Sequence, residues 1–221
     1  RLAAEERKGE EVREVVFDAD KILVAMGRVP NFGGIDLTAL GIDHDRKGIK
    51  TDERMQTNVP GIYAIGDVTC SPALAHVASA EGIICVEKLA GLDPEPLEYK
   101  NIPACTYTSP EIASVGYTEA SAREAGYEIK VGKFPFTASG KASASGLKEG
   151  FVKLIFDAAY GELLGAHMIG AGVTEMIAGI VVARKLETTA HEIIKAVHPH
   201  PTMSEAIMEA AAAAYGEVIH L

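Results

Sequence analysis

The segment His198-Pro199-His200-Pro201-Thr202-Met203-Ser204-Glu205 precedes an alanine-rich stretch that runs to Tyr215. Each proline fixes its own φ and disfavours helical angles in the histidine before it. A helix is therefore expected only after Pro201, with Thr202 as its N-cap and Glu205 three residues further on. A side chain at that position points back toward the helix start. We therefore expect the Glu205 carboxylate within reach of the His200 imidazole.

Several interpretations are open for this segment. A carboxylate on one imidazole nitrogen fixes the tautomer and supports a positive charge, which leaves the other nitrogen free to move protons. Thr-x-x-Glu is also the capping-box signature, in which Glu205 only accepts a hydrogen bond from the Thr202 backbone N–H. His198 and His200 could equally belong to a metal site or a packed turn. A metal site is the weakest of these, because no further ligands stand at the usual spacings.

Composition and charge indicate a globular chain. Its 221 residues leave room for one large or two modest domains, and 48% of them are hydrophobic against 24% charged. Against 31 acidic residues there are 21 basic ones, a formal net charge of −10, and no basic run. Nucleic acid is therefore not expected as a partner. The longest apolar stretch, residues 168–183, is interrupted by Glu175 and is too short to cross a bilayer.

The cysteines give no sign of a disulfide framework. Cys70, Cys85 and Cys105 form no Cys-x-x-Cys pair, and their number is odd. We expect three small buried residues in a protein of a reducing compartment.

Up to about residue 98 the pattern predicts pieces of an α/β fold. The expected strands are 11–17, 21–26 and 59–67, and the last two have the apolar character of buried strands. A short helix is expected between the glycines at 33–34 and 41, and a longer one over 73–90, with Ser71 as N-cap, Pro72 at its first position and Gly91 after its end. The proline-containing segment 92–98 is the best linker candidate.

Beyond the linker the pattern predicts an α+β domain, an antiparallel sheet with helices on one face. The expected strands are one bent at Pro110 (105–108 and 113–115), one over 128–136, and a hairpin of 151–157 and 163–169. Helices are expected over 118–125, over 173–186, and after a cap formed by Thr189 and Glu192, and a polar turn is expected over 139–145.

A second candidate site lies where the strand 59–67 ends in Gly-Asp. Asp67 stands where ligands bind in open α/β sheets, and it could accept hydrogen bonds from sugar-like hydroxyls. The following helix start, with Leu74, Ala75 and His76, offers unpaired amides and a positive dipole end. An Asx turn and a solvated helix start would explain the same residues. Gly27, just past the strand 21–26, suits close approach of a ligand or an ordinary Gly-Pro turn.

Taken together, these segments resemble the flavin disulfide reductases. His-Pro-Thr-x-Ser-Glu is similar to the signature in which a histidine is the acid/base and a glutamate orients it, which implies these roles for His200 and Glu205. Tyr-Ala-Ile-Gly-Asp at 63–67 resembles the second FAD fingerprint, whose aspartate binds the ribitol, here Asp67. Residues 74–76 are similar to the segment whose backbone touches the flavin. Residues 25–31 resemble the end of the NAD domain, which would place Gly27 near the nicotinamide nucleotide.

The resemblance runs from about residue 15 to the end of the chain. Residues 107–111 and 134–136 resemble the family's dimerisation domain, while Ala73 and Pro199 depart from the common pattern. The implied division is a C-terminal tail of the NAD-binding domain (1–28), the C-terminal part of the FAD-binding central domain (29–98), and the dimerisation (interface) domain (99–221). The family's two Gly-x-Gly-x-x-Gly loops and its Cys-x4-Cys redox disulfide are missing, and the chain does not begin with Met. We therefore expect a C-terminal portion that is inactive alone.

The pattern is most similar to the branch of the family that oxidises dihydrolipoamide with FAD and NAD⁺. That branch implies a homodimer through residues 99–221, in which His200 serves the partner subunit's active site. It also implies lipoyl domains of 2-oxoacid dehydrogenase complexes or of the glycine cleavage system as partners, no membrane, and the bacterial cytoplasm or the mitochondrial matrix as the location. The alternatives are a reductase of the glutathione or mercuric type, and a non-catalytic dimerisation module.

Overall fold

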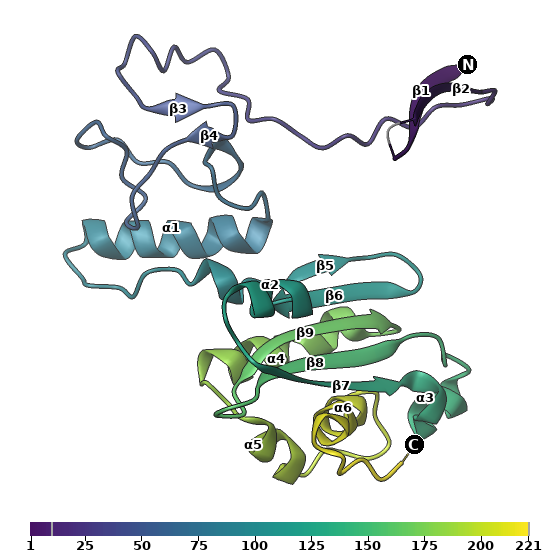
Figure 1. Cartoon of the computed structure of the whole chain (residues 1–221). Coiled ribbons are helices and arrows are strands. Elements are labelled where there is room, and N and C mark those ends of the chain that lie inside the picture. The colour runs from purple at the N-terminus through teal and green to yellow at the C-terminus, as the bar shows by residue number, and fades with distance from the viewer. Residues whose placement is uncertain (10, 221) are drawn as a thin grey trace. The chain divides into compact units, whose positions relative to one another are not determined.

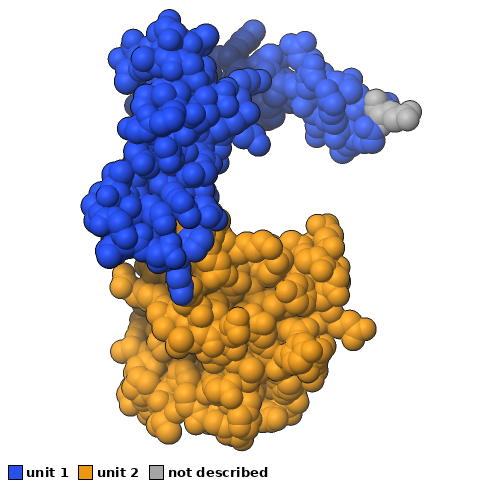
Figure 2. All heavy atoms as spheres, turned by 90° about the vertical axis from the view of Figure 1, so that its left-hand side faces the viewer, with its two compact units in different colours: residues 1–96 blue, residues 97–221 orange. Residues whose placement is uncertain are grey.

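The computed structural model describes residues 1–9 and 11–220. It divides into two compact units, residues 1–96 and 97–221, which Figure 2 shows in different colours. The division falls inside the segment 92–98, where the linker was predicted. The domain boundaries at residues 28 and 98 stay predictions.

The first unit holds two small antiparallel sheets and one long helix (Figure 1). Strands β1 (Leu2–Lys8) and β2 (Glu11–Phe17) form a hairpin, so the strand expected over 11–17 is confirmed. Strands β3 (His44–Asp45) and β4 (Gly48–Ile49) form the second pair. The 3-10 helix η1 (Gly66–Val68) and helix α1 (Ala75–Leu89) complete the unit.

The predictions of buried strands over 21–26 and 59–67 are wrong. Residues 21–26 carry no regular secondary structure, and Leu23 and Met26 are 90% and 93% exposed. Residues 59–67 make only an isolated bridge, between Gln56 and Tyr63, before η1. An apolar run becomes a buried strand only where neighbouring strands accept its hydrogen bonds and other elements cover its faces. Here β1 and β2 pair with each other alone.

The helix predicted between residues 33 and 41 is also wrong. This segment forms consecutive turns, in which the Leu40 N–H donates to Asp36 O at 3.2 Å and the Gly41 N–H donates to Thr38 O at 3.0 Å. Gly41 has φ +69°, which ends the turn before a helix can propagate.

Helix α1 starts later than predicted. Its N-cap is Leu74, not Ser71, because the Ser71 hydroxyl is paired with Thr69 Oγ1 at 2.7 Å. The Leu74 N–H donates to Pro72 O at 2.8 Å, so Pro72 lies in a turn before the helix. The predicted end is confirmed, since Gly91 follows the helix with φ +83° and its N–H donates to Lys88 O.

The second unit is built on a five-stranded antiparallel sheet in the order β5-β6-β9-β8-β7 (Figure 1). The strands are β5 (Ala104–Thr106), β6 (Glu111–Gly116), β7 (Ile129–Pro135), β8 (Phe151–Asp157) and β9 (Leu163–Gly170). The predicted hairpin of β8 and β9 is confirmed. The single bent strand predicted around Pro110 is instead the hairpin of β5 and β6, because residues 107–110 reverse the chain and Cys105 pairs with Ala113.

Three helices of this unit share one face of the sheet and one core. They are α4 (Val173–Lys185), α5 (Ala190–Lys195) and α6 (Glu205–Tyr215), packed with inward side chains of the strands, to which β5 contributes the half-buried Cys105. Helix α2 (Glu119–Glu124) packs with Ile155 and Leu164 in a separate cluster, and its Glu119 receives a hydrogen bond from Lys153 at 2.9 Å. The predicted fold class is confirmed, and α2 is the element added on the opposite face.

Three short elements complete this unit. The 3-10 helix η2 (Tyr99–Asn101) precedes β5, and η3 (Phe136–Ala138) leads into helix α3 (Gly140–Ser145), where a polar turn was predicted. The turn prediction is wrong because Ser139 Oγ accepts from the Ala142 N–H and caps a run of small helix-compatible residues. Gly146, with φ +71°, ends the helix.

The cysteines are free thiols in different settings. Cys85 is buried as predicted and Cys105 half-buried, and burial raises the pKa of both. Cys70 is exposed, so its predicted burial is wrong. In the part of the chain that the structure describes, no helix combines the length and apolarity needed to cross a membrane.

Candidate functional site

Helix α6 begins with the candidate acid/base pair. His200 Nδ1 lies 2.8 Å from Glu205 Oε1, while Glu205 Oε2 accepts a hydrogen bond from the Thr202 backbone N–H at 2.8 Å. The pairing and the capping interaction therefore coexist, one on each carboxylate oxygen. The His200 side chain is 74% exposed and that of Glu205 is 27% exposed. The imidazole is thus held from one side and accessible from the other.

The N-cap of α6 is Ser204 and not the predicted Thr202. The Thr202 hydroxyl donates to Pro199 O at 2.7 Å, so its oxygen is turned toward the preceding loop and not toward the helix. Glu205 is consequently the first residue of the helix rather than the third helical position. It still reaches back to the preceding residues, since its Oε2 accepts the Thr202 N–H.

The electrostatics favour an ionised Glu205. Burial acts most strongly on the pKa of this carboxyl group and raises it, but hydrogen bonds from Thr202 N–H and His200, with the charges of His200 and His220, outweigh burial. The pKa of Glu205 is therefore below its ordinary value. An ionised carboxylate only accepts hydrogen bonds, so Nδ1 of His200 carries the proton and Nε2 is the nitrogen that can take one up.

His198 does not join this pair. Its Nδ1 lies 3.1 Å from the backbone oxygen of Ala196, an interaction within its own loop. Residues 1–9 and 11–220 contain no group of three or more His, Cys, Asp or Glu side chains arranged to hold a metal ion.

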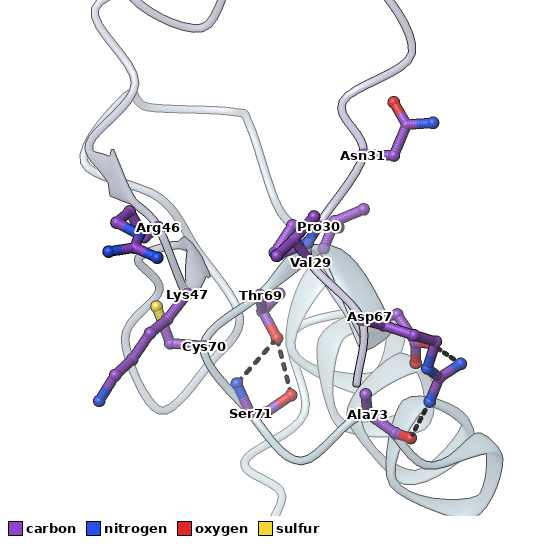
Figure 3. Close-up of a pocket in the computed structure, with 12 residues that line it drawn as sticks. Val29, Pro30, Asn31, Arg46, Lys47, Asp67, Thr69, Cys70, Ser71 and Ala73 are labelled. Atoms are coloured by element: carbon purple, nitrogen blue, oxygen red, sulfur yellow. Dashed lines mark hydrogen bonds and ion pairs between the residues drawn. The ribbon is translucent and has the colours of Figure 1, made fainter. Parts of the chain in front are cut away.

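The second candidate site is a cavity of about 570 Å³ in the first unit, drawn in Figure 3. Asp67 lines it on one side, and Arg46 and Lys47 lie on the other. Asp67 Oδ2 accepts a hydrogen bond from Arg28 Nη1 at 3.1 Å, and Arg28 Nη2 donates to Ala73 O at 3.0 Å. Carboxylates accept from sugar hydroxyls and cationic side chains bind phosphate, so this lining fits the hydroxyl- and phosphate-bearing part of a dinucleotide.

The other predicted cofactor residues follow or precede lining residues in the chain but do not line the cavity themselves. Leu74 is the half-buried N-cap of α1, and Ala75 and His76 form its exposed first turn. The cavity lining ends at Ala73, directly before them. Gly27 is exposed, with φ +88°, next to the lining residue Arg28.

Sequence reasoning missed two residues that shape the Asp67 turn. One is Arg28, the partner of Asp67. The other is Glu81 of α1, a residue 1% exposed, whose Oε2 accepts the Gly66 N–H at 2.7 Å. Val77, Glu81 and Cys85 are four residues apart and all buried, so a carboxylate on the apolar face of the helix was the signal.

It also missed a second imidazole–carboxylate pair on α6. Glu209 Oε1 lies 2.5 Å from His220 Nδ1. Glu209 follows the buried Ala206 and Ile207 and precedes the buried Ala210. The signal in the sequence was again a charged residue on the apolar face of a helix.

Comparison with known proteins identifies both units. Residues 2–82 match the family described as pyridine nucleotide-disulphide oxidoreductase, and residues 102–211 match the dimerisation domain of the same family. The second match includes the whole sheet and the residue pair at the start of α6.

Similar curated proteins are named dihydrolipoyl dehydrogenase. The chain is 54% identical to the protein from Zymomonas mobilis over 90% of its own length and 43% of the relative's, and 52% identical to that from Rhizobium etli over 91% and 42%. The chain thus spans less than half the length of these relatives.

The fold has solved counterparts. LpdA from Mycobacterium tuberculosis matches with a TM-score of 0.82 and 29% identity, over 96% of this chain and 47% of the other. The Cu(II) complex of the HOCl-induced flavoprotein disulfide reductase RclA from Escherichia coli matches with a TM-score of 0.83 and 25% identity, over 96% and 50%. The matches to the family models, the similar curated proteins and the shared fold all agree with the resemblance found in the sequence. The chain belongs to the pyridine nucleotide-disulphide oxidoreductase family.

Proposed function

We propose that the chain is the C-terminal portion of a dihydrolipoyl dehydrogenase, the FAD-dependent enzyme that oxidises protein-bound dihydrolipoamide with NAD⁺. The observation that carries the proposal is the accessible His200 imidazole held by Glu205 at 2.8 Å. The shared name of the relatives, at 43–54% identity, supports this branch over a reductase of the glutathione or mercuric type. A non-catalytic dimerisation module would have no need of an oriented, exposed imidazole.

In this proposal His200 takes the proton of a substrate thiol on Nε2. The thiolate is the reactive form of a thiol, so removal of this proton activates the substrate. Glu205 fixes the Nδ1–H tautomer beforehand and stabilises the imidazolium afterwards. Such a positioned acid/base contributes about 10²–10⁴-fold to the rate.

We further propose that the cavity at Asp67 holds part of FAD. Asp67 would accept hydrogen bonds from the ribityl hydroxyls, and Leu74, Ala75 and His76 would present the start of α1 to the flavin ring. Gly27 would lie near NAD. When bound, FAD supplies the two-electron redox step between the dithiol and NAD⁺.

The match to the dimerisation domain supports a proposal for the oligomeric state of the enzyme. We propose a homodimer through residues 99–221, in which His200 serves the partner subunit's dithiol and flavin site. Lipoyl domains of 2-oxoacid dehydrogenase complexes or of the glycine cleavage system would deliver the substrate, in the bacterial cytoplasm, or in the matrix for a mitochondrial parent. The chain alone would be inactive, because it carries neither the Cys-x4-Cys pair nor the glycine-rich loops.

The test is His200→Ala in the full-length enzyme. We expect a loss of about 10²–10⁴-fold in dihydrolipoamide oxidation, with the flavin absorbance of the purified protein unchanged. His198→Ala is the matched control, since His198 lies in the same loop and bonds only to backbone within it. Near-normal turnover of the His200→Ala enzyme would overturn the assignment. Faster turnover of glutathione disulfide or mercuric ion by the unmodified enzyme would favour the other branches.

A further inference from the structure

A buried carboxyl group lies beneath the turn that carries Asp67. It belongs to Glu81, which stands near the middle of α1 and is 1% exposed. Its Oε2 accepts the backbone N–H of Gly66 at 2.7 Å. Gly66 is the first residue of η1 and directly precedes Asp67. This hydrogen bond therefore joins α1 to the start of the turn.

The turn is fixed at both of its ends. The backbone oxygen of Gly66 accepts from the Thr69 N–H at 2.9 Å and from the Thr69 hydroxyl at 2.8 Å. Gly66 and Thr69 are buried, whereas the side chain of Asp67 between them is 52% exposed and lines the cavity of Figure 3. The buried bonds thus hold the backbone, and the carboxylate of Asp67 faces the cavity.

The turn lies directly against α1. A Cβ built at Gly66 would lie 3.1 Å from the Cβ of Ala78, and one built at Gly82 would lie 3.3 Å from Cδ1 of Ile65. Gly66 also has φ +72°, a conformation that glycine adopts without strain. A buried backbone N–H that loses its acceptor is costly. Without the carboxyl group of Glu81, the turn would therefore shift to conformations in which this N–H finds another acceptor.

We propose that Glu81 is a positioning residue for FAD, which holds the turn in the conformation that presents Asp67 to the ribityl hydroxyls. Glu81 does not touch the cofactor in this role, since it acts through Asp67. The inference deepens the proposed function and rests on the assignment of Asp67 to FAD. A turn that adopts several conformations binds more weakly, in proportion to the fraction of molecules in the binding conformation.

Arg28, the other partner of Asp67, does not replace this support. Its side chain is 72% exposed, and it lies in a segment without regular secondary structure. Exposed ion pairs contribute little to the stability of a conformation. Arg28 also bonds to the carboxylate itself, whereas Glu81 holds the backbone that carries it. The conformation of the turn therefore depends on the buried bond.

The experiment measures the affinity of the full-length apoenzyme for FAD in Glu81→Met and in its matched control, Glu81→Gln. Methionine has a similar length and suits the buried face that Glu81 shares with Val77 and Cys85, but its thioether is only a weak acceptor. Glutamine keeps an oxygen that can accept the Gly66 N–H. We expect the dissociation constant for FAD to rise about tenfold in Glu81→Met and to stay within about twofold in Glu81→Gln. Titration with FAD, followed by flavin fluorescence, measures both.

Asp67→Asn completes a double-mutant cycle with Glu81→Met. Because Glu81 acts through Asp67, its substitution should weaken FAD binding much less in the Asp67→Asn enzyme than in the unmodified one. A second variant, Glu81→Asp, keeps a carboxyl group but withdraws it from Gly66 by one methylene. It should lose affinity as Glu81→Met does, and it serves if methionine disturbs folding.

Amide exchange of the cofactor-free 221-residue chain reports on the turn directly. The Gly66 amide should exchange faster in Glu81→Met and Glu81→Asp than in the unmodified chain, and at the unmodified rate in Glu81→Gln. Unchanged exchange of Gly66 in the first two variants would contradict the proposal, because the turn would then not depend on the carboxyl group.

Unchanged FAD affinity in Glu81→Met and Glu81→Asp would overturn the proposal. An equal loss in Glu81→Gln, or an undiminished loss in the Asp67→Asn enzyme, would also overturn it, because Glu81 would then support the fold of α1 and not the presentation of Asp67. Failure of the proposed function is separately visible. It appears as unchanged FAD affinity of the single variant Asp67→Asn, and the inference then fails with it.

Discussion

At the scale of single residues, the place of α6 on the sheet depends on the absence of one side chain. Gly132 of β7 is buried directly beneath the helix, and a Cβ built there would lie 1.8 Å from Ala210 O and 2.6 Å from Ala214 N. These are backbone atoms, which cannot rotate away as a flexible side chain can. The position of Glu205 relative to the sheet therefore depends on this glycine.

Gly132→Ala should push α6 off β7. We expect the free energy of unfolding of the second unit to fall by about 1–3 kcal/mol, the usual cost of overpacking a close contact. Urea unfolding followed by circular dichroism measures it.

The matched control is Gly179→Ala on α4. A Cβ at this exposed helical position has no heavy atom within 4 Å, so alanine should stabilise the chain by about 0.5–1 kcal/mol. Equal changes in the free energy of unfolding for the two substitutions would show that the close contact between α6 and β7 does not exclude a side chain at position 132.

At the scale of elements, the same Thr-x-x-Glu spacing starts α5 and α6 differently. In α5, Thr189 is the N-cap and Glu192 accepts its backbone N–H at 3.1 Å. In α6 the glutamate makes the same bond to Thr202, but the helix begins at Glu205 itself. The second carboxylate oxygen of Glu205 is thereby turned to His200. The Thr202 hydroxyl makes this difference, because it donates to Pro199 O at 2.7 Å and so does not cap the helix as Thr189 does.

This carboxylate should link the stability of the α6 start to acid pH. The folded-state pKa of Glu205 lies below its ordinary value of 4.5, so its stabilising contribution is present above that value and is lost as pH falls through the folded pKa. We expect Glu205→Gln to be less stable than the unmodified chain at pH 7, and the gap to close at pH values below 4.5. Urea midpoints measured across this range test the prediction, and a gap independent of pH would contradict it.

At the scale of the whole molecule, the two units differ in how well they are packed. The second unit has a continuous core of strand and helix residues, including the fully buried Phe134, Phe136 and Phe156. In the first unit, residues 18–31 form no regular secondary structure, and large apolar side chains such as Leu23, Val24 and Met26 are exposed. Exposed apolar patches of this kind mark surfaces that other chain segments normally cover.

Hydrogen exchange should therefore separate the units. We expect strong amide protection in β6, β8 and β9 and exchange close to the unprotected rate over residues 18–31, because these amides have no partner strand. Mass spectrometry of peptides from the exchanged chain measures both. Uniform protection across residues 1–96 would contradict this, and would indicate that the first unit packs as tightly as the second.

Much of this organisation follows from the sequence by itself. The hairpin of β8 and β9, helix α4 and the capped start of α5 were predicted correctly, because alternation, helical period and caps are properties of consecutive residues. The segment 198–205 was sufficient to bring His200 and Glu205 together, since they are five residues apart and two prolines restrict the chain between them. The family resemblance, now confirmed, came from the same short motifs. The roles of these residues stay predictions.

What only the tertiary structure decided involves residues far apart in the chain or a choice of strand partner. The apolar runs 21–26 and 59–67 have the composition of buried strands, yet a strand forms only where a neighbouring strand pairs with it along its length. Residues 21–26 have no such pairing in the described structure, and residues 59–67 have only the isolated bridge between Gln56 and Tyr63. The pairs Arg28–Asp67 and Glu209–His220 span 39 and 11 positions and depend on where the chain turns back. Local patterns fix the angles of a few neighbouring residues, whereas these contacts depend on the path of everything between them.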